Sequence, residues 1–178
     1  MAPINSVCNR KYMREPLDGK ASHKNIIVLH DTEGGTAESI ARYFQHNSGG
    51  YTHLVVDDKD CYRCLENLDI PRGAPGANSL GFHIEQCGYA KWSLVIWKTH
   101  LNTLKRAAYK TALHCHKLHI PPVFIKAPEL KAGAKGITTH AECTKAFGGS
   151  HTDPGAGWPR YLFMSYVKKY YSELTQVL

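Results

Sequence analysis

NIIVLHDTEGGTAESIARYF, residues 25–44, contains an apolar run, a polar turn and an amphipathic stretch, in that order. The apolar run is rich in β-branched side chains, which is typical of a strand buried at the centre of a sheet. After the glycine pair, Thr36 is placed to cap a helix over residues 36–45. Ile40 and Phe44 lie one turn apart on that helix. A buried strand followed by an amphipathic helix predicts an α/β fold.

Strands and helices alternate along the rest of the chain, and no linker is long enough to divide it. The predicted strands are residues 52–56 and 62–65, which form a hairpin, then 80–85, 123–125 and, briefly, 136–139; the predicted helices are 101–118 and one with Pro159 in its first turn. We expect a single domain over residues 1–178 in which helices flank a central sheet. Residues 1–24 read as an irregular lead-in.

The predicted strand that ends at Glu85 alternates apolar and polar side chains. Successive side chains of a strand point to opposite faces, so Leu80, Phe82 and Ile84 should enter the core. His83 and Glu85 should share the other face. Two titratable side chains are therefore expected side by side.

Composition is that of an ordinary globular protein, with 178 residues, 43% hydrophobic and 21% charged. No run approaches the ~20 apolar residues that a membrane span needs, so membrane insertion is not expected. The formal net charge of +7 favours polyanionic partners. The basic residues are dispersed, however, and a nucleic-acid partner is not expected.

The six cysteines are scattered rather than regularly spaced, and we expect free thiols. They are Cys8, Cys61, Cys64, Cys87, Cys115 and Cys143. The pair at positions 61 and 64 has the spacing of half a structural zinc site. No second such pair exists, so a metal site there is not predicted.

A hydrolytic zinc site commonly uses three nitrogen or carboxylate ligands and leaves a fourth position open. The chain has 11 histidines, so position must select among them. His30 follows the buried strand, His140 follows residues 136–139, and Asp153 lies further on in the HTDPG segment. These three are the metal-ligand candidates.

Three more histidines, His114, His116 and His119, fall on or just after the predicted long helix. Two of them are one turn apart and have the spacing to chelate a metal. A solvated basic helix face is the preferred interpretation.

Five segments together resemble a known family, the type-2 amidase and peptidoglycan-recognition-protein group of zinc amidases. They are IVLHDTEG (27–34), YTHLVVD (51–57), GFHIE (81–85), ITTH (137–140) and HTDPG (151–155). The loops GAPGAN (73–78) and AFGG (146–149) are similar to amidase domains of phage endolysins that attack mycobacteria and related actinobacteria. The resemblance implies a central mixed sheet flanked by helices. It also implies hydrolysis of the amide between N-acetylmuramic acid and L-alanine in peptidoglycan.

The resemblance also implies roles for particular residues. His30, His140 and Asp153 would hold Zn²⁺, and Glu85 would accept a proton from the attacking water. The residue two before the third ligand is often a lysine that stabilises the oxyanion, and here it is His151. Because histidine is not a permanent cation, this role would require a protonated ring or a neutral hydrogen bond.

Four residues are candidates for substrate contact: Tyr51, His53, His83 and Asn78. Some family members carry a catalytic tyrosine directly before the histidine of the second strand, where this chain has Thr52. A shift of one residue reverses the face of a strand, so Tyr51 is expected to line the cleft without a catalytic role. His53 and His83 could instead orient ligands, or be ordinary buried histidines.

Two other functions remain open from the sequence. A non-catalytic peptidoglycan-binding module would share the fold, although it would need no third metal ligand. A zinc peptidase would share the metal, although no His-Glu-x-x-His motif is present. The start of the chain shows no secretory signal. We therefore expect a monomer made in the cytoplasm of a host bacterium, which reaches the wall after a holin-type release.

Overall fold

The computed structural model describes residues 7–177 and contains a five-stranded sheet in the order β3-β2-β4-β1-β5. The strands are β1 (Ile26–Asp31), β2 (Leu54–Val56), β3 (Cys61–Arg63), β4 (Gly81–Gln86) and β5 (Gly136–Thr139). The helices are α1 (Ala37–His46), α2 (Leu94–Thr99), α3 (Leu101–Lys117), α4 (Ala127–Lys131), α5 (His140–Phe147) and α6 (Arg160–Val177). Within residues 7–177, no helix is long and apolar enough to cross a membrane.

The sheet is mixed, as expected. β1 runs parallel to both β4 and β5, and β2 runs parallel to β4 but antiparallel to β3. Every residue of β1 and β4 is buried, because helices or loops cover both faces of the sheet. The apolar run that follows Asn25 is therefore a central strand.

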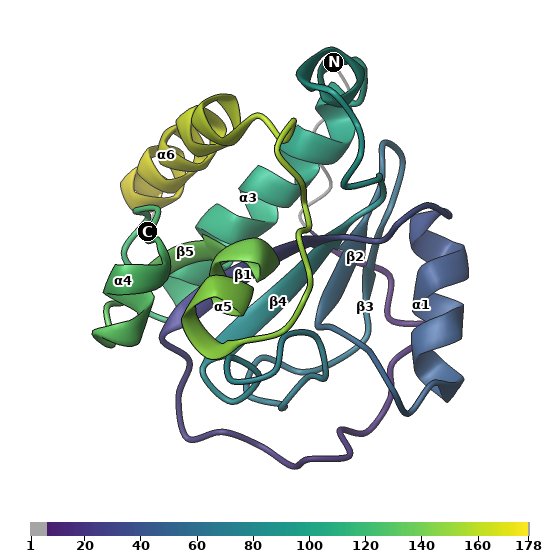
Figure 1. The fold of residues 1–178 in the computed structure, drawn as a ribbon. Helices are drawn as coiled ribbons and strands as arrows, with labels where there is room; N and C mark the ends of the chain where they lie inside the picture. The colour runs from purple at the N-terminus through teal and green to yellow at the C-terminus, as the bar shows by residue number, and fades with distance from the viewer. Residues whose placement is uncertain (1–6, 178) are drawn as a thin grey trace.

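Helices α3 and α6 pack together on one face of the sheet, where Ile27, Leu29 and Phe82 point into the main core. On the opposite face, Val28 packs with α4, α5 and the loop of residues 73–78. Figure 1 shows α1 beside β2 and β3, at the other end of the sheet from α5.

Local signals predicted several elements correctly. Thr36 caps α1: its hydroxyl accepts a hydrogen bond from the backbone N–H of Ser39, whose hydroxyl accepts one from the N–H of Thr36. The hairpin of β2 and β3 forms as expected. Phe163 and Val167 of α6 enter the main core.

Other expectations were wrong. Leu80 precedes β4 and is 36% exposed rather than in the core. Residues 123–125 do not form a strand. They contribute only an isolated bridge between Phe124 and Ile137. His140 directly follows β5, as expected, and is also the first residue of α5, but the short helices α2, α4 and α5 were not predicted.

Free thiols were predicted for every cysteine, but the structure contains a disulfide between Cys8 and Cys61. The lead-in runs alongside β3, where Asn9 donates its backbone N–H to the carbonyl of Cys61 at 2.8 Å. The partners are 53 residues apart in sequence, so spacing gave no signal. The free cysteines are Cys64, Cys87, Cys115 and Cys143, all buried.

The predicted solvated histidine face of α3 was also wrong. His114 is 1% exposed and stacks on Phe82 with ring centroids 4.0 Å apart. Its Nδ1 lies 2.8 Å from the carbonyl oxygen of Lys110, and its Nε2 lies 2.9 Å from a guanidinium nitrogen of Arg63. His119 alone of the three histidines is exposed. Helical spacing located the residues but not the face that packs on the sheet.

Candidate metal centre

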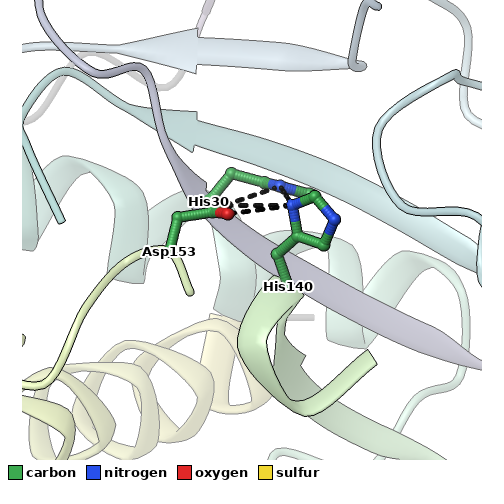
Figure 2. A group of neighbouring side chains, drawn as sticks. All are labelled: His30, His140 and Asp153. Atoms are coloured by element: carbon green, nitrogen blue, oxygen red, sulfur yellow. Dashed lines mark hydrogen bonds and ion pairs between the residues drawn. The ribbon is translucent and has the colours of Figure 1, made fainter. Parts of the chain in front are cut away.

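Three side chains remote in the sequence meet where the parallel strands β1 and β5 end. They are His30 of β1, His140 at the start of α5, and Asp153 in the loop before α6 (Figure 2). The two Nδ1 atoms are 3.2 Å apart. Asp153 Oδ2 lies 3.1 Å from His30 Nδ1 and 3.2 Å from His140 Nδ1. The structure thus brings together all three predicted ligands.

Parallel pairing explains why these residues meet. β5 lies beside β1 and ends at the same edge, so the residue after β5 emerges near His30. Thr139 caps α5 by accepting a hydrogen bond from the backbone N–H of Glu142, which begins the helix at His140. The N–H of Ala141 donates to the carbonyl of Asp153 at 2.9 Å and holds the loop against the helix.

The electrostatics of this group suit a cation. All three residues are buried. Burial opposes ionisation of Asp153, but hydrogen bonds with His140 and His30 outweigh it and hold the pKa of this carboxyl well below its usual range. Burial also lowers the pKa of His30, which favours the neutral imidazole that a metal ligand requires.

The donor set fits zinc. Two imidazole nitrogens and one carboxylate leave a fourth position of a tetrahedron open, as in catalytic zinc sites. Magnesium and calcium prefer sites built from oxygen ligands. The ligand atoms lie within 4.8 Å of one another, which is close enough to share a single ion.

Glu85 approaches the same centre from β4, where it pairs in register with His30. Its side chain is buried, and Oε2 has no hydrogen-bond partner among the described residues. Burial, reinforced by the carboxylates of Asp153 and Asp31, raises the pKa of Glu85 well above its ordinary value. A divalent cation on Asp153 would oppose this effect and favour an ionised Glu85.

A cleft of about 880 Å³ opens beside the centre and is lined by all three ligand residues and by Glu85. His151 also lines it, with a side chain that is 62% exposed. The ring of His151 stacks on His140 with centroids 4.1 Å apart, and its Nδ1 lies 3.6 Å from Asp153 Oδ1. The predicted oxyanion partner therefore lies directly beside the ligands.

The model of the N-acetylmuramoyl-L-alanine amidase family matches residues 20–156. The chain belongs to this family. The match includes the three candidate ligands and Glu85. Among curated proteins, none matches the sequence.

Solved structures of amidases and endolysins share the fold at low identity. The Staphylococcus aureus hydrolase AmiA, in complex with its ligand, has a TM-score of 0.70 at 16% identity, over 95% of this chain and 83% of that one. The E90A mutant of PlyL has a TM-score of 0.66 at 17% identity, and the match covers 91% of this chain and 99% of that one. A mutant endolysin from Bacillus subtilis has a TM-score of 0.60 at 17% identity, and the match covers 90% of this chain and 98% of that one. The mixed sheet with flanking helices is the fold of these enzymes.

Two predicted substrate contacts of this amidase-family chain, Tyr51 and Asn78, line the cleft. Tyr51 is 1% exposed, and its hydroxyl accepts a hydrogen bond from the backbone N–H of Leu17. Asn78 Oδ1 accepts from the backbone N–H groups of Gly73 and Ala74, which closes the loop 73–78. Both polar groups therefore also hold the cleft wall in place.

The other two predicted substrate contacts, His53 and His83, are fully buried and do not line the cleft. His53 Nε2 lies 3.0 Å from the carbonyl oxygen of Asp69, and its Nδ1 accepts the backbone N–H of His83. The His83 ring contacts His30. Burial lowers the pKa of both rings well below 6.5.

Sequence reasoning missed Asp31, which lines the cleft and is 7% exposed. Burial raises the pKa of Asp31 to about 7, and its Oδ2 has no partner among the described residues. Its position directly after His30 was a signal that could have been used. Arg72 and Asp18, joined by two hydrogen bonds at 2.6 and 2.8 Å, form another part of the cleft wall that was not predicted.

Proposed function

We propose that the protein is a zinc-dependent N-acetylmuramoyl-L-alanine amidase. Its substrate is the amide that joins the lactyl group of muramic acid to L-alanine of the peptidoglycan stem peptide. The observation that carries this proposal is the convergence of His30, His140 and Asp153 within 4.8 Å at an open cleft. Membership of the amidase family supports the choice of bond.

Amide hydrolysis needs a nucleophile and stabilisation of the oxyanion. Zinc at such a site lowers the pKa of water toward ~7 and acts as a Lewis acid. Glu85, which lines the cleft beside the three ligands, accepts the proton of the attacking water and delivers it to the departing amine nitrogen. His151, at the cleft and beside His140, donates a hydrogen bond to the carbonyl oxygen as negative charge develops there.

A non-catalytic binding module accounts for these features less well. Binding a muropeptide requires neither an ionised Asp153 between two buried imidazoles nor a buried Glu85 whose Oε2 has no hydrogen-bond partner among the described residues. Removing charged and polar groups from water is unfavourable unless they are compensated. A catalytic cation would provide that compensation.

The direct test is digestion of purified peptidoglycan, followed by mass spectrometry of the fragments and elemental analysis of the enzyme. We expect one zinc per chain and new free L-alanine amino termini, with the muramic acid lactyl group released as a carboxylate. Cleavage between two amino acids of the stem peptide would indicate a peptidase instead. Intact peptidoglycan after incubation with zinc-loaded protein would refute an enzymatic role.

We further propose that the enzyme serves phage-induced lysis and acts on the wall after release from the cytoplasm. The loops 73–78 and 146–149 and the fold likeness to endolysins support this role. Expression in a susceptible bacterium should cause lysis only when a membrane-permeabilising protein is expressed with it. Lysis by the amidase alone would contradict the proposed route.

A further inference from the structure

His30 has two ring nitrogens with different surroundings. Nδ1 faces His140 and Asp153, whereas Nε2 lies 3.0 Å from Nδ1 of His83. A neutral imidazole carries its proton on one nitrogen only. For Nδ1 to present a lone pair to a metal, the proton must lie on Nε2, and the neighbour of Nε2 must accept a hydrogen bond.

His83 can be that acceptor. Its ring is 0% exposed and stacks on the ring of His30, with centroids 5.1 Å apart and planes at 24°. An imidazole that carries no proton on Nδ1 can accept a hydrogen bond at that nitrogen. A neutral His83 that accepts at Nδ1 carries its own proton on Nε2.

The backbone leaves a fitted space for this ring. A Cβ at Gly73 would lie 2.6 Å from His83 Nδ1, and a Cβ at Gly81 would lie 2.6 Å from His83 Nε2. Neither glycine has a positive φ, so close approach of the ring, rather than backbone conformation, is what requires glycine. Gly73, in a loop, and Gly81, in β4, therefore both leave room for an imidazole at position 83.

His83 is also a poor choice for packing alone. Its Nε2 makes no hydrogen bond of normal distance and angle among the residues the structure describes, although the Ala77 backbone is close enough to interact with the ring. A buried donor without a partner destabilises a fold, and an apolar side chain of similar size would avoid that penalty. A histidine at position 83 is explained if Nδ1, its other ring nitrogen, makes a hydrogen bond that the site requires.

We propose that His83 is a positioning residue for the metal centre. It accepts the Nε2 proton of His30, which fixes the tautomer and the orientation of the His30 ring and directs the Nδ1 lone pair toward zinc. This inference rests on the proposed zinc site. Metal-bound histidines usually donate their second N–H to a carboxylate, carbonyl or water, so a buried histidine in this place is a specific feature of the chain.

The test compares His83→Leu with His83→Asn. Leucine has no polar atom, whereas the asparagine side-chain oxygen occupies nearly the position of histidine Nδ1 and accepts a hydrogen bond. The measurements are the zinc Kd, by competition with a chromophoric chelator, and the urea midpoint of the metal-free protein. We expect His83→Leu to weaken zinc binding about 10–100-fold without lowering the urea midpoint, and His83→Asn to restore binding to near the wild-type value.

Nitrogen-15 NMR of zinc-loaded wild-type protein gives a second readout that does not depend on a variant folding. We expect His83 to carry its proton on Nε2 and to show a hydrogen-bonded lone pair on Nδ1. A proton on His83 Nδ1, or wild-type zinc affinity in folded His83→Leu, would overturn the positioning role alone. Failure of the wild-type protein to bind zinc would overturn the proposed metal site as well, so the two failures are distinguishable.

Discussion

Glu85 is a carboxyl group in surroundings that oppose its ionisation. Burial and the neighbouring carboxylates raise the pKa of this side chain, and Oε2 has no partner among the described residues. Such groups concentrate at active sites, because a proton acceptor with a pKa near the working pH transfers protons most effectively. Glu85 is not one of the three ligands. Its role can therefore be separated from metal binding.

We predict that Glu85→Gln retains zinc but lowers kcat by about 10²–10⁴-fold. The amide has nearly the same shape but cannot accept the proton of the attacking water. Zinc content and peptidoglycan turnover, measured on the same preparation, check this expectation. Asp153→Asn is the matched comparison, because it should lose both. Full turnover by Glu85→Gln would remove this residue from the mechanism.

Helix α3 is attached to β4 partly through His114, which must stay neutral in the fold. Burial lowers the pKa of His114 to about 3, with a further contribution from the Arg63 guanidinium. The folded state therefore binds fewer protons than the unfolded state at pH values between about 3 and the ordinary value of 6.5. The contribution of neutral His114 to the free energy of unfolding is therefore complete above pH 6.5 and is lost as the pH falls below that value.

We predict that His114→Gln reduces the dependence of stability on acid pH. The side chain of glutamine can accept the Arg63 hydrogen bond but does not titrate, so a slope of up to about 1.4 kcal/mol per pH unit should be lost. Urea unfolding at pH 7 and pH 4 measures the difference. His119→Gln, at an exposed position after α3, should behave as the wild type. Equal slopes for wild type and His114→Gln would contradict the prediction.

The Cys8–Cys61 disulfide joins the lead-in to β3 and closes a loop with a sequence separation of 53. Cross-linking restricts the unfolded chain, and a loop of this length corresponds to about 4 kcal/mol in the chain-entropy description. We predict that Cys8→Ser lowers the free energy of unfolding by about 2–4 kcal/mol. Urea unfolding with and without a reductant checks this, since reductant should destabilise the wild type but not Cys8→Ser. The same midpoint for oxidised and reduced wild type would be inconsistent with a stabilising bridge.

For the whole molecule, the candidate metal centre links three parts of the chain. His30, His140 and Asp153 come from the central strand, the start of α5 and the loop before α6. Because these ligands converge only in the folded state, a bound ion stabilises the entire fold.

We predict that zinc at 100 times its Kd stabilises the protein by about 2.7 kcal/mol, which raises Tm by ~5–10 °C for a chain of this size. Calorimetry with zinc, and again after removal by a chelator, measures the shift. Asp153→Ala should show no shift. A zinc-independent Tm in the wild type would argue against a site that forms on folding.

The sequence by itself determined the features that depend on neighbouring residues. The run before His30 was identified as a buried strand, Thr36 as a helix cap, and residues 101–118 and the segment after Pro159 as helices. Strand ends, together with the family resemblance, pointed to the three ligands. These signals are short-range, because capping, periodicity and strand propensity act over a few residues.

Only the tertiary structure decided which surfaces and atoms meet. Helical spacing could not show that His114 faces β4, and the separation of 53 residues gave no sign of the Cys8–Cys61 bridge. The sequence placed His83 beside Glu85 on one strand face, but only packing set its Nδ1 3.0 Å from His30 Nε2. The reason is physical: burial and contacts between distant segments are set by how elements pack together, which no local pattern of residues specifies.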